Sequence, residues 1–289
     1  MILLAAATLA QATFSSRTIV VVVPVSVMDG AGRSIPGLSK DQFRLYDEGK
    51  PQSIATFAQG EAGVTVGLVI DRSASMRLKL SAVTDALERF ARAARPSDEL
   101  FLVAFNERVS RAAFAAGPFT SNALELRAAM APLQALGTTA LHDALIEAAG
   151  HVRHGTASQK ALVVISDGRD NASRQTFDRA LAVVQEAGAA VYTIGLSTDP
   201  EDRRSQRDLR RLSHESGGTA YFLPGVEDVA PVLDRITRDL RDQYLLGFVP
   251  DLSGSSPSRI RVTVDAPGHR RVTVRNRASY VPPIDSPSF

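Results

Sequence analysis

An aspartate and two serines occupy alternate positions where an apolar run ends. In VGLVIDRSASM, residues 66–76, the run stops at Asp71, and Ser73 and Ser75 follow at intervals of two. In a loop that leaves a strand, this spacing can turn one carboxylate and two hydroxyls toward one point. Such oxygen donors suit a hard divalent cation, Mg²⁺ in particular, and the stretch offers no soft ligand for zinc or copper.

Two other segments place polar side chains where a strand ends or a helix begins. Thr138 and Thr139 precede a helical pattern, and Ser166 and Asp167 follow the apolar run KALVVI. Each segment has a purely structural alternative, as a helix N-cap or a polar turn, and so has DRSAS. In open α/β sheets, however, ligands bind at the carboxyl ends of the strands. Three such segments at one edge of one sheet therefore favour a shared site.

The elements that must position these residues lie between residues 63 and 241. This zone alternates apolar strand patterns with helical ones, which predicts an α/β fold with a doubly wound, mostly parallel six-stranded sheet. GVTVGLVI is apolar throughout, as expected for a strand covered on both faces. The predicted strands are 63–70, 99–105, 109–114, 160–166, 189–196 and 219–223. The predicted helices are 77–95, 121–133, 139–153, 176–188, 207–218 and 226–243. The glycines that end the fifth helix favour a left-handed cap.

The two flanks of this zone have strand patterns of their own. Residues 17–60 contain a β-branched run and an alternating segment around a turn at Glu48 and Gly49, and residues 243–283 return to alternation. Both flanks are short for independent domains. We therefore predict that they pack together as one small β-sandwich-like domain, interrupted by the central zone. The alternative is two separate hairpins that lean on the central domain.

The motifs DRSASM, GTTALHDAL and SDGRDN, in this order, resemble the von Willebrand factor type A domain and its metal-ion-dependent adhesion site. The resemblance spans residues 63–241 and implies a sheet order of 3-2-1-4-5-6, with the metal between the first and fourth strands. It implies Mg²⁺ or Mn²⁺ as cofactor and a non-enzymatic role, in which a partner protein's Asp or Glu completes the metal's shell. The ligands that it implies are Asp71, Ser73, Ser75, Thr139 and Asp167, with Thr138 competing for the place of Thr139 and Asp167 often acting through water.

The flanks resemble an acidobacterial-type bacterial group of related proteins, which are usually exported. Residues 1–16 are apolar and end in small residues, as in a leader segment, although they lack a basic start. No later stretch is long and apolar enough to span a bilayer. We therefore expect an exported protein that is periplasmic, secreted or on the cell surface.

Composition limits the other function classes. There is no cysteine, which excludes disulfides and thiolate chemistry, and the net charge of +2 does not suggest a nucleic-acid partner. Two arginine-rich stretches, 201–211 and 259–277, are best explained as solvated helix and strand faces, although peripheral membrane association stays open. His151 and His154 are expected in solvent at a helix end.

The main functional alternative is a metal-dependent hydrolase or phosphatase that uses the same site. A cation with open positions could act as a Lewis acid, and His142, close after Thr139, could serve as a base. The simpler interpretation of His142 is an ordinary residue in the first turn of a helix. No nucleophile elbow, phosphate-binding loop or dinucleotide fingerprint is present.

Overall fold

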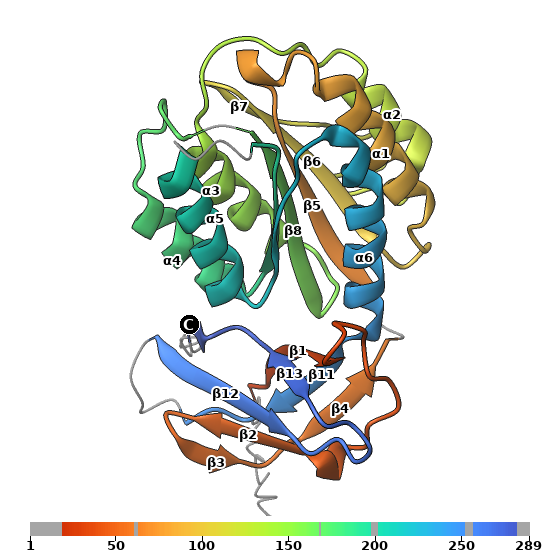
Figure 1. The fold of residues 1–289 in the computed structure, drawn as a ribbon, viewed down its shortest axis with the longest axis vertical. Helices are drawn as coiled ribbons and strands as arrows, with labels where there is room; N and C mark the ends of the chain where they lie inside the picture. Colours follow the sequence, from red (N-terminus) through yellow and green to blue (C-terminus); the bar gives the residue numbers. More distant parts are fainter. Residues whose placement is uncertain (1–18, 61–62, 168, 198–201, 252–256, 282–289) are drawn as a thin grey trace, which may run out of the picture.

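The computed structural model describes residues 19–60, 63–167, 169–197, 202–251 and 257–281. The predicted leader, residues 1–16, lies outside these ranges. An α/β domain sits above a smaller all-β domain, and helix α6 (Val229–Asp242) runs down from the first domain into strand β11 (Tyr244–Phe248) of the second (Figure 1). No helix in the described part of the chain has the length and apolar character needed to cross a membrane.

The central sheet has six strands in the order β10-β9-β8-β5-β6-β7. All neighbours are parallel except β6 and β7, which are antiparallel. Read from the other edge, this is the predicted order 3-2-1-4-5-6. Every residue of β5 is buried, as its unbroken apolar run predicted. The bounds are β5 (Val64–Asp71), β6 (Glu99–Phe105), β7 (Val109–Arg111), β8 (Gln159–Ser166), β9 (Ala190–Gly195) and β10 (Ala220–Phe222).

Helices cover both faces of this sheet and enclose two separate hydrophobic cores. One face carries α1 (Leu80–Arg92), α2 (Ala123–Met130) and α6, and the other carries α3 (Leu141–Val152), α4 (Phe177–Ala187) and α5 (Arg203–Ser216). Helix α5 begins four residues before its predicted start. It ends at Gly217, whose φ of +88° is the predicted left-handed cap.

One side chain of α3 contradicts its predicted environment. His151 was expected in solvent, but only 6% of it is exposed. Its ring lies against Phe101 and Phe119, with centroid distances of 4.7 and 4.9 Å. The prediction failed because His151 packs against β6 and against the segment that leads into α2, which helical spacing alone does not reveal. His154 is exposed, as expected.

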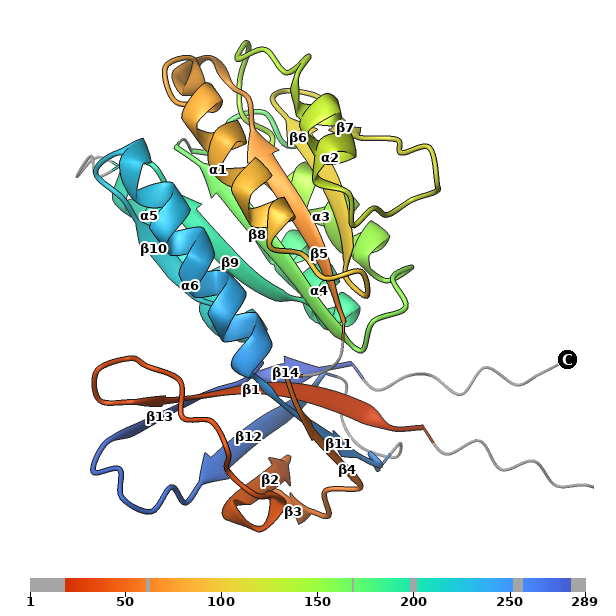
Figure 2. The same ribbon diagram turned by 90° about the vertical axis from the view of Figure 1, so that its right-hand side faces the viewer.

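The flanks form two antiparallel four-stranded sheets, and each sheet takes strands from both flanks. The first has the order β13-β1-β11-β4 and the second β14-β12-β2-β3 (Figure 2). Facing side chains such as Val23, Phe43, Tyr244 and Val262 share one hydrophobic core. The flanks are thus one packed unit and not separate hairpins. The remaining bounds are β1 (Val21–Asp29), β2 (Phe43–Asp47), β3 (Lys50–Gln52), β4 (Thr56–Gln59), β12 (Ser258–Val264), β13 (Val272–Arg275) and β14 (Ser279–Tyr280).

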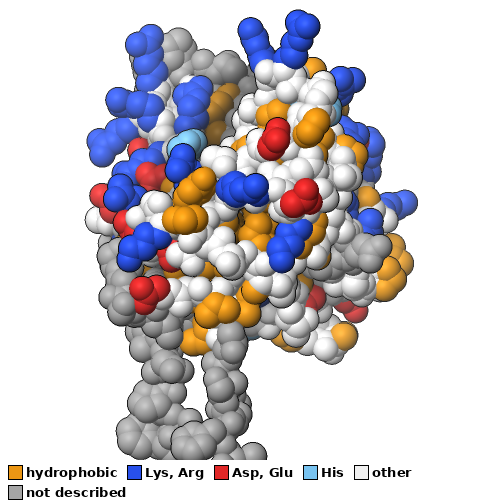
Figure 3. Space-filling view, turned by 90° about the horizontal axis from the view of Figure 1, so that it is seen from below, with side chains coloured by type: hydrophobic (Ala, Val, Ile, Leu, Met, Phe, Trp, Pro, Cys, Tyr) orange, Lys and Arg blue, Asp and Glu red, His pale blue; other side chains and the backbone are white. Residues whose placement is uncertain are grey.

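The arginines of the C-terminal flank have two different environments. Arg259 and Arg261 are exposed on β12, as predicted, and Lys and Arg side chains are spread over this face among hydrophobic and acidic ones (Figure 3). The expectation of solvated positions is wrong for Arg275 and Arg277. Only 17% of the Arg275 side chain is exposed, and burial lowers the pKa of Arg277 to about 10. The reason is that the end of β13 faces the α/β domain.

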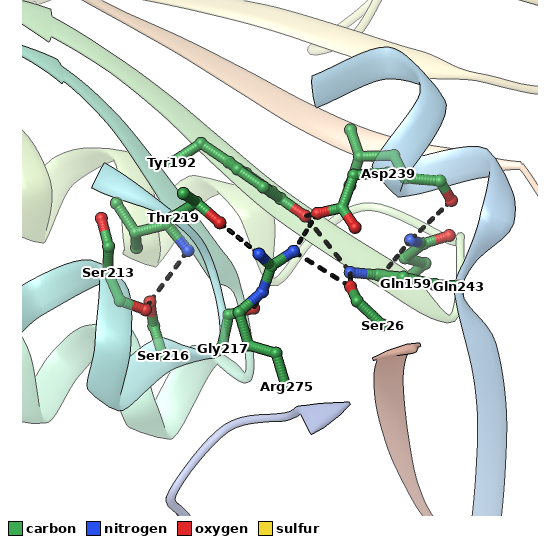
Figure 4. A network of polar contacts seen from close by, with 12 residues as sticks. Ser26, Gln159, Tyr192, Ser213, Ser216, Gly217, Thr219, Asp239, Gln243 and Arg275 are labelled. Carbon is green, nitrogen blue, oxygen red and sulfur yellow. Dashed lines mark hydrogen bonds and ion pairs between the residues drawn. The ribbon is translucent and has the colours of Figure 1, made fainter. Parts of the chain in front are cut away.

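Arg275 lies at the centre of a polar network between the two domains (Figure 4). Its guanidinium donates to the carbonyl of Gly217 at 3.0 Å and to the hydroxyl of Ser26 at 3.0 Å. It also forms an ion pair with Asp239 of α6, which accepts a hydrogen bond from the Tyr192 hydroxyl at 2.5 Å. The base of the α/β domain is therefore tied to the sandwich by one charged side chain.

Candidate functional site

Asp71 is the last residue of β5, and its carboxylate is held from two directions. One oxygen, Oδ1, accepts the backbone N–H of Ser73 at 2.8 Å, and the other, Oδ2, accepts the hydroxyl of Ser166 at 2.5 Å. The side chain is fully buried, and this burial raises the pKa of Asp71 above its usual range, partly offset by these hydrogen bonds. The carboxylate therefore sits between the ends of β5 and β8, at the point where the strand order reverses.

The two serines extend this arrangement to the third loop. Ser73 precedes a short 3₁₀ helix, η2 (Ala74–Met76), and its Oγ lies 3.1 Å from the Oγ of Ser75. Ser75 in turn donates its hydroxyl to Oδ1 of Asp167 at 2.7 Å. Four of the five predicted ligands, including two carboxylates 96 positions apart in the sequence, are thus joined by short polar contacts.

The second loop lies between the other two. The backbone of Ala74 donates to the carbonyl of Gly137 at 3.0 Å, and the backbone of Thr139 donates to the side chain of Asn171 at 2.8 Å. Thr139 is buried, whereas Thr138 is exposed, so burial favours Thr139 as the inward residue. Thr139 forms its hydrogen bonds through its backbone. Across the described ranges, its hydroxyl has no hydrogen-bond partner.

Lys79 is a charged member of the site that the sequence analysis did not identify. Its ammonium forms an ion pair with Oδ2 of Asp167 and donates to the carbonyl of Leu196 at 3.2 Å. The Asp167 side chain is only 2% exposed, and a buried carboxylate requires a counter-charge or several donors. The available signal was the position of Lys79, eight residues after Asp71 and one before α1.

Third-loop residues beyond Asp167 hold the start of α3. Oδ2 of Asp170 accepts the backbone N–H of His142 at 2.9 Å and the hydroxyl of Ser173 at 2.5 Å. The His142 ring lies 3.5 Å from Asp170 and 3.3 Å from the carbonyl of Gln175. None of these recorded partners is a predicted metal ligand, so the geometry of His142 is that of a helix-start residue and gives no support to a base directed at Asp71.

The donor set fits a hard divalent cation. It consists of two carboxylates and neighbouring hydroxyls, with oxygen as the only ligating atom. Within the described ranges there is no group of three or more His, Cys, Asp or Glu that could hold a metal. A site that draws half or more of its donors from Ser and Thr does not need such a group. Hydroxyl donors also leave the set low in negative charge.

Comparison with known protein families gives one match. The profile of the von Willebrand factor type A domain matches residues 65–235. No curated protein matches the sequence. Among solved structures, a von Willebrand factor type A protein from Catenulispora acidiphila has a TM-score of 0.54 and 15% identity, over 93% of this chain and 75% of that one.

Two other solved structures are similar over about two thirds of this chain. Proximal thread matrix protein 1 from the mussel byssus, with a zinc-occupied MIDAS motif, has a TM-score of 0.55 and 14% identity, over 67% of this chain and 49% of that one. A mutant PilB minor pilin from Streptococcus sanguinis has a TM-score of 0.51 and 14% identity, over 64% of this chain and 62% of that one. This chain therefore spans under two thirds of either protein, and likeness at such identities establishes the fold alone.

Proposed function

Because this chain belongs to the von Willebrand factor type A domain family, we propose that it is a divalent-metal-dependent protein-binding module of the adhesion type. The cation would be Mg²⁺ or Mn²⁺. When bound, it supplies an electrophilic centre that attracts an Asp or Glu carboxylate of a partner protein. The residues proposed to hold it are Asp71, Ser73, Ser75, Thr139 and Asp167.

One observation carries this proposal: the hydroxyl of Ser75 joins the first loop to Asp167 of the third at 2.7 Å. That contact, together with the 3.1 Å separation of Ser73 and Ser75, brings hard donors from different strand ends to one point. Asp71 and Asp167 supply negative charge, and the hydroxyls supply neutral donors. With few anionic ligands, a cation held there keeps its attraction for an incoming carboxylate.

Exposed leucines support a protein as the partner. The structure describes five exposed large hydrophobic side chains, and two of them flank the metal loops. Leu78, three residues after Ser75, is 93% exposed, and Leu136, directly before the second loop, is 51% exposed. Leu136 also bonds through its backbone to the carbonyl of Arg72 at 2.9 Å. These side chains give the surface beside the metal loops apolar area that a partner protein could bury.

We further propose an exported location, in the periplasm, at the cell surface or secreted, and membership of the acidobacterial-type group. The similarity to a minor pilin and to a mussel byssus protein supports an extracellular role. Nucleic acid is not a proposed partner, because the exposed arginines of β12 are individually engaged. Arg259 pairs with Glu48, and Arg261 lies over the ring of Tyr46 at 4.4 Å.

The first test is calorimetric titration of Mg²⁺ and Mn²⁺ into metal-free protein, with Asp71→Ala as the variant. We expect binding in the wild type and its loss in the variant, because Asp71 is the buried anionic donor of the first loop. Ser81→Ala, on the exposed side of α1, is the matched control and should bind like the wild type.

Partner capture is tested by selecting a random peptide library on the immobilised protein with Mg²⁺ and eluting with a chelator. Enrichment of peptides that contain Asp or Glu, absent with Asp71→Ala, is the expected result. Chelator-resistant binding or retention without acidic residues would contradict the proposal. Hydrolysis of phosphate esters that is lost in Asp71→Ala would instead favour the hydrolase alternative.

A further inference from the structure

Lys79 places a fixed positive charge inside the candidate metal site. Its backbone begins α1, where its carbonyl accepts the N–H of Val83 at 3.0 Å. Its side chain extends to the ends of β8 and β9, where it contacts Asp167 and the carbonyl of Leu196. About a third of the side chain, 31%, is exposed. Both ends of the lysine are therefore held, and the ammonium stays beside the carboxylate.

The charges of the inner site nearly cancel without a metal. Both oxygens of Asp167 are engaged, one by Ser75 and the other by Lys79. The two carboxylates, Asp71 and Asp167, and the one ammonium sum to −1. Glu107 lies outside this set, at an exposed position where it accepts the N–H of Thr138 at 3.2 Å. A divalent cation would bring the inner set to +1, whereas without the lysine the same cation would bring it to zero.

We propose that Lys79 is a built-in counter-ion of the metal site, which holds Asp167 in place before metal binds and lowers the affinity of the site for divalent cations. This inference rests on the proposed metal-dependent function. The first effect follows because Asp167 is almost fully buried and has an ammonium as its charged partner. The second follows because a cation and an ammonium that share a carboxylate repel each other at short range and low dielectric.

The experiment compares the wild type with Lys79→Met and Lys79→Arg by calorimetric titration of Mn²⁺ and Mg²⁺. We expect Lys79→Met to bind metal more tightly by about tenfold or more, the scale on which outer-shell partners change metal affinity. Lys79→Arg keeps the charge and should stay close to the wild type. Arg77→Met is the matched control, because Arg77 is an exposed cation two residues away and, within the described residues, it makes no contact with Asp167.

Thermal unfolding gives a second readout, which in chelator does not depend on metal affinity. In chelator, Lys79→Met should unfold at a lower temperature than the wild type, because Asp167 then lacks its counter-ion. Saturating Mn²⁺ should narrow this difference, since the metal replaces the missing charge. Arg77→Met should show neither effect.

Each outcome bears on a separate claim. If the wild type binds metal and Lys79→Met binds equally or more weakly, the counter-ion inference is overturned while the metal site stands. An unchanged unfolding temperature in chelator would overturn the claim that Lys79 holds Asp167. If neither the wild type nor any variant binds metal, the proposed function is contradicted. The claim that Lys79 lowers metal affinity is then contradicted as well.

Discussion

The two buried carboxylates of the candidate site depend on donors from other loops. Asp71 accepts from Ser73 and Ser166, and Asp167 accepts from Ser75 and Lys79. A carboxylate removed from water is costly unless hydrogen bonds or opposite charge replace its hydration. The contacts that offset the desolvation cost of these carboxylates also fix the direction in which their oxygens point. Folding stability and site geometry are therefore linked at each residue.

Ser166→Ala tests this link at a residue outside the proposed ligand set. The hydroxyl of Ser166 is the side-chain donor to Oδ2 of Asp71, and both side chains are buried. We expect the variant to lose about 1–3 kcal/mol of unfolding free energy and about 10–100-fold in metal affinity. Urea unfolding in chelator measures the first quantity and calorimetry the second.

Ser81→Ala, on the exposed surface of α1, serves as the control for Ser166→Ala. A Ser166 variant with wild-type stability and metal affinity would show that this hydroxyl neither stabilises nor orients Asp71. A loss of metal affinity alone would indicate orientation without a net contribution to stability.

At the level of strands and helices, the sequence predicted the central domain well because each element carries its own periodic signal. The strand order was available from the family resemblance, and the end of α5 from its glycine. The positions of Asp71 and Asp167 at strand ends were readable for the same reason. The contact of Lys79 with Asp167 was not, because it spans 88 positions and depends on how a helix start approaches another strand.

Burial of single helical side chains was the least predictable feature. His151 follows the helical pattern of α3, but its environment is set by a loop more than 30 residues earlier, where the carbonyl of Pro118 lies 3.1 Å from its Nε2. The inward turn of Arg275 and Arg277 was missed for a similar reason, since it depends on the packing of two domains. Neither local propensity nor alternation encodes contacts of this kind.

His151 should make stability depend on pH through α3. Burial lowers the pKa of His151, with Arg111 and His154 acting in the same direction and the Pro118 carbonyl and Glu147 opposing them. The unfolded chain therefore binds the proton more readily than the folded one. The His151 contribution is complete above about pH 6.5, the ordinary value, and is lost as pH falls from there through the lower folded-state pKa.

The measurement is the free energy of urea unfolding between pH 8 and pH 5, for the wild type and His151→Gln. We expect the wild type to lose stability more steeply below about pH 6.5 than the variant does. His269→Gln, which alters an exposed histidine of the β-sandwich, should follow the wild type. Identical slopes for the wild type and His151→Gln would contradict the assignment.

Across the whole molecule, the candidate site and the β-sandwich lie at opposite ends of the central sheet. The site is formed at the carboxyl ends of β5 and β8, whereas Gln159, the first residue of β8, bonds to Gln243 at the junction with the sandwich. Helix α6 spans this distance, and its 14 residues are about 21 Å long. Helix α6 and the sheet itself are therefore two physical connections between the candidate site and the sandwich.

The end of α6, at the junction between the two domains, carries two ion pairs. Asp98, directly before β6, forms an ion pair with Arg241 at the end of α6, while Asp239, two residues before Arg241, pairs with Arg275 of the sandwich. Burial would raise the pKa of Asp98, but hydrogen bonds from Arg241 and from two backbone amides outweigh it and hold the pKa below its usual range. The end of α6 is thus fixed on both sides by paired, largely buried charges.

Arg275→Met tests how much the polar network at the junction stabilises the protein. The variant leaves Asp239 paired only with the Tyr192 hydroxyl, and it removes donors to Gly217 and Ser26. Breaking a buried ion pair from one side costs about 3–5 kcal/mol. We therefore expect a lower unfolding midpoint in guanidinium and faster hydrogen exchange at the end of α6 and in β13.

The control is Arg259→Met, which removes an exposed arginine of β12 and should leave both the midpoint and the exchange rates unchanged. The metal affinity of Arg275→Met should match the wild type, because the partners of Arg275 in the described part of the chain lie at the junction and not in a metal loop. Unfolding and exchange equal to the wild type would mean that the hydrophobic contacts of the junction, and not this network, hold the domains together.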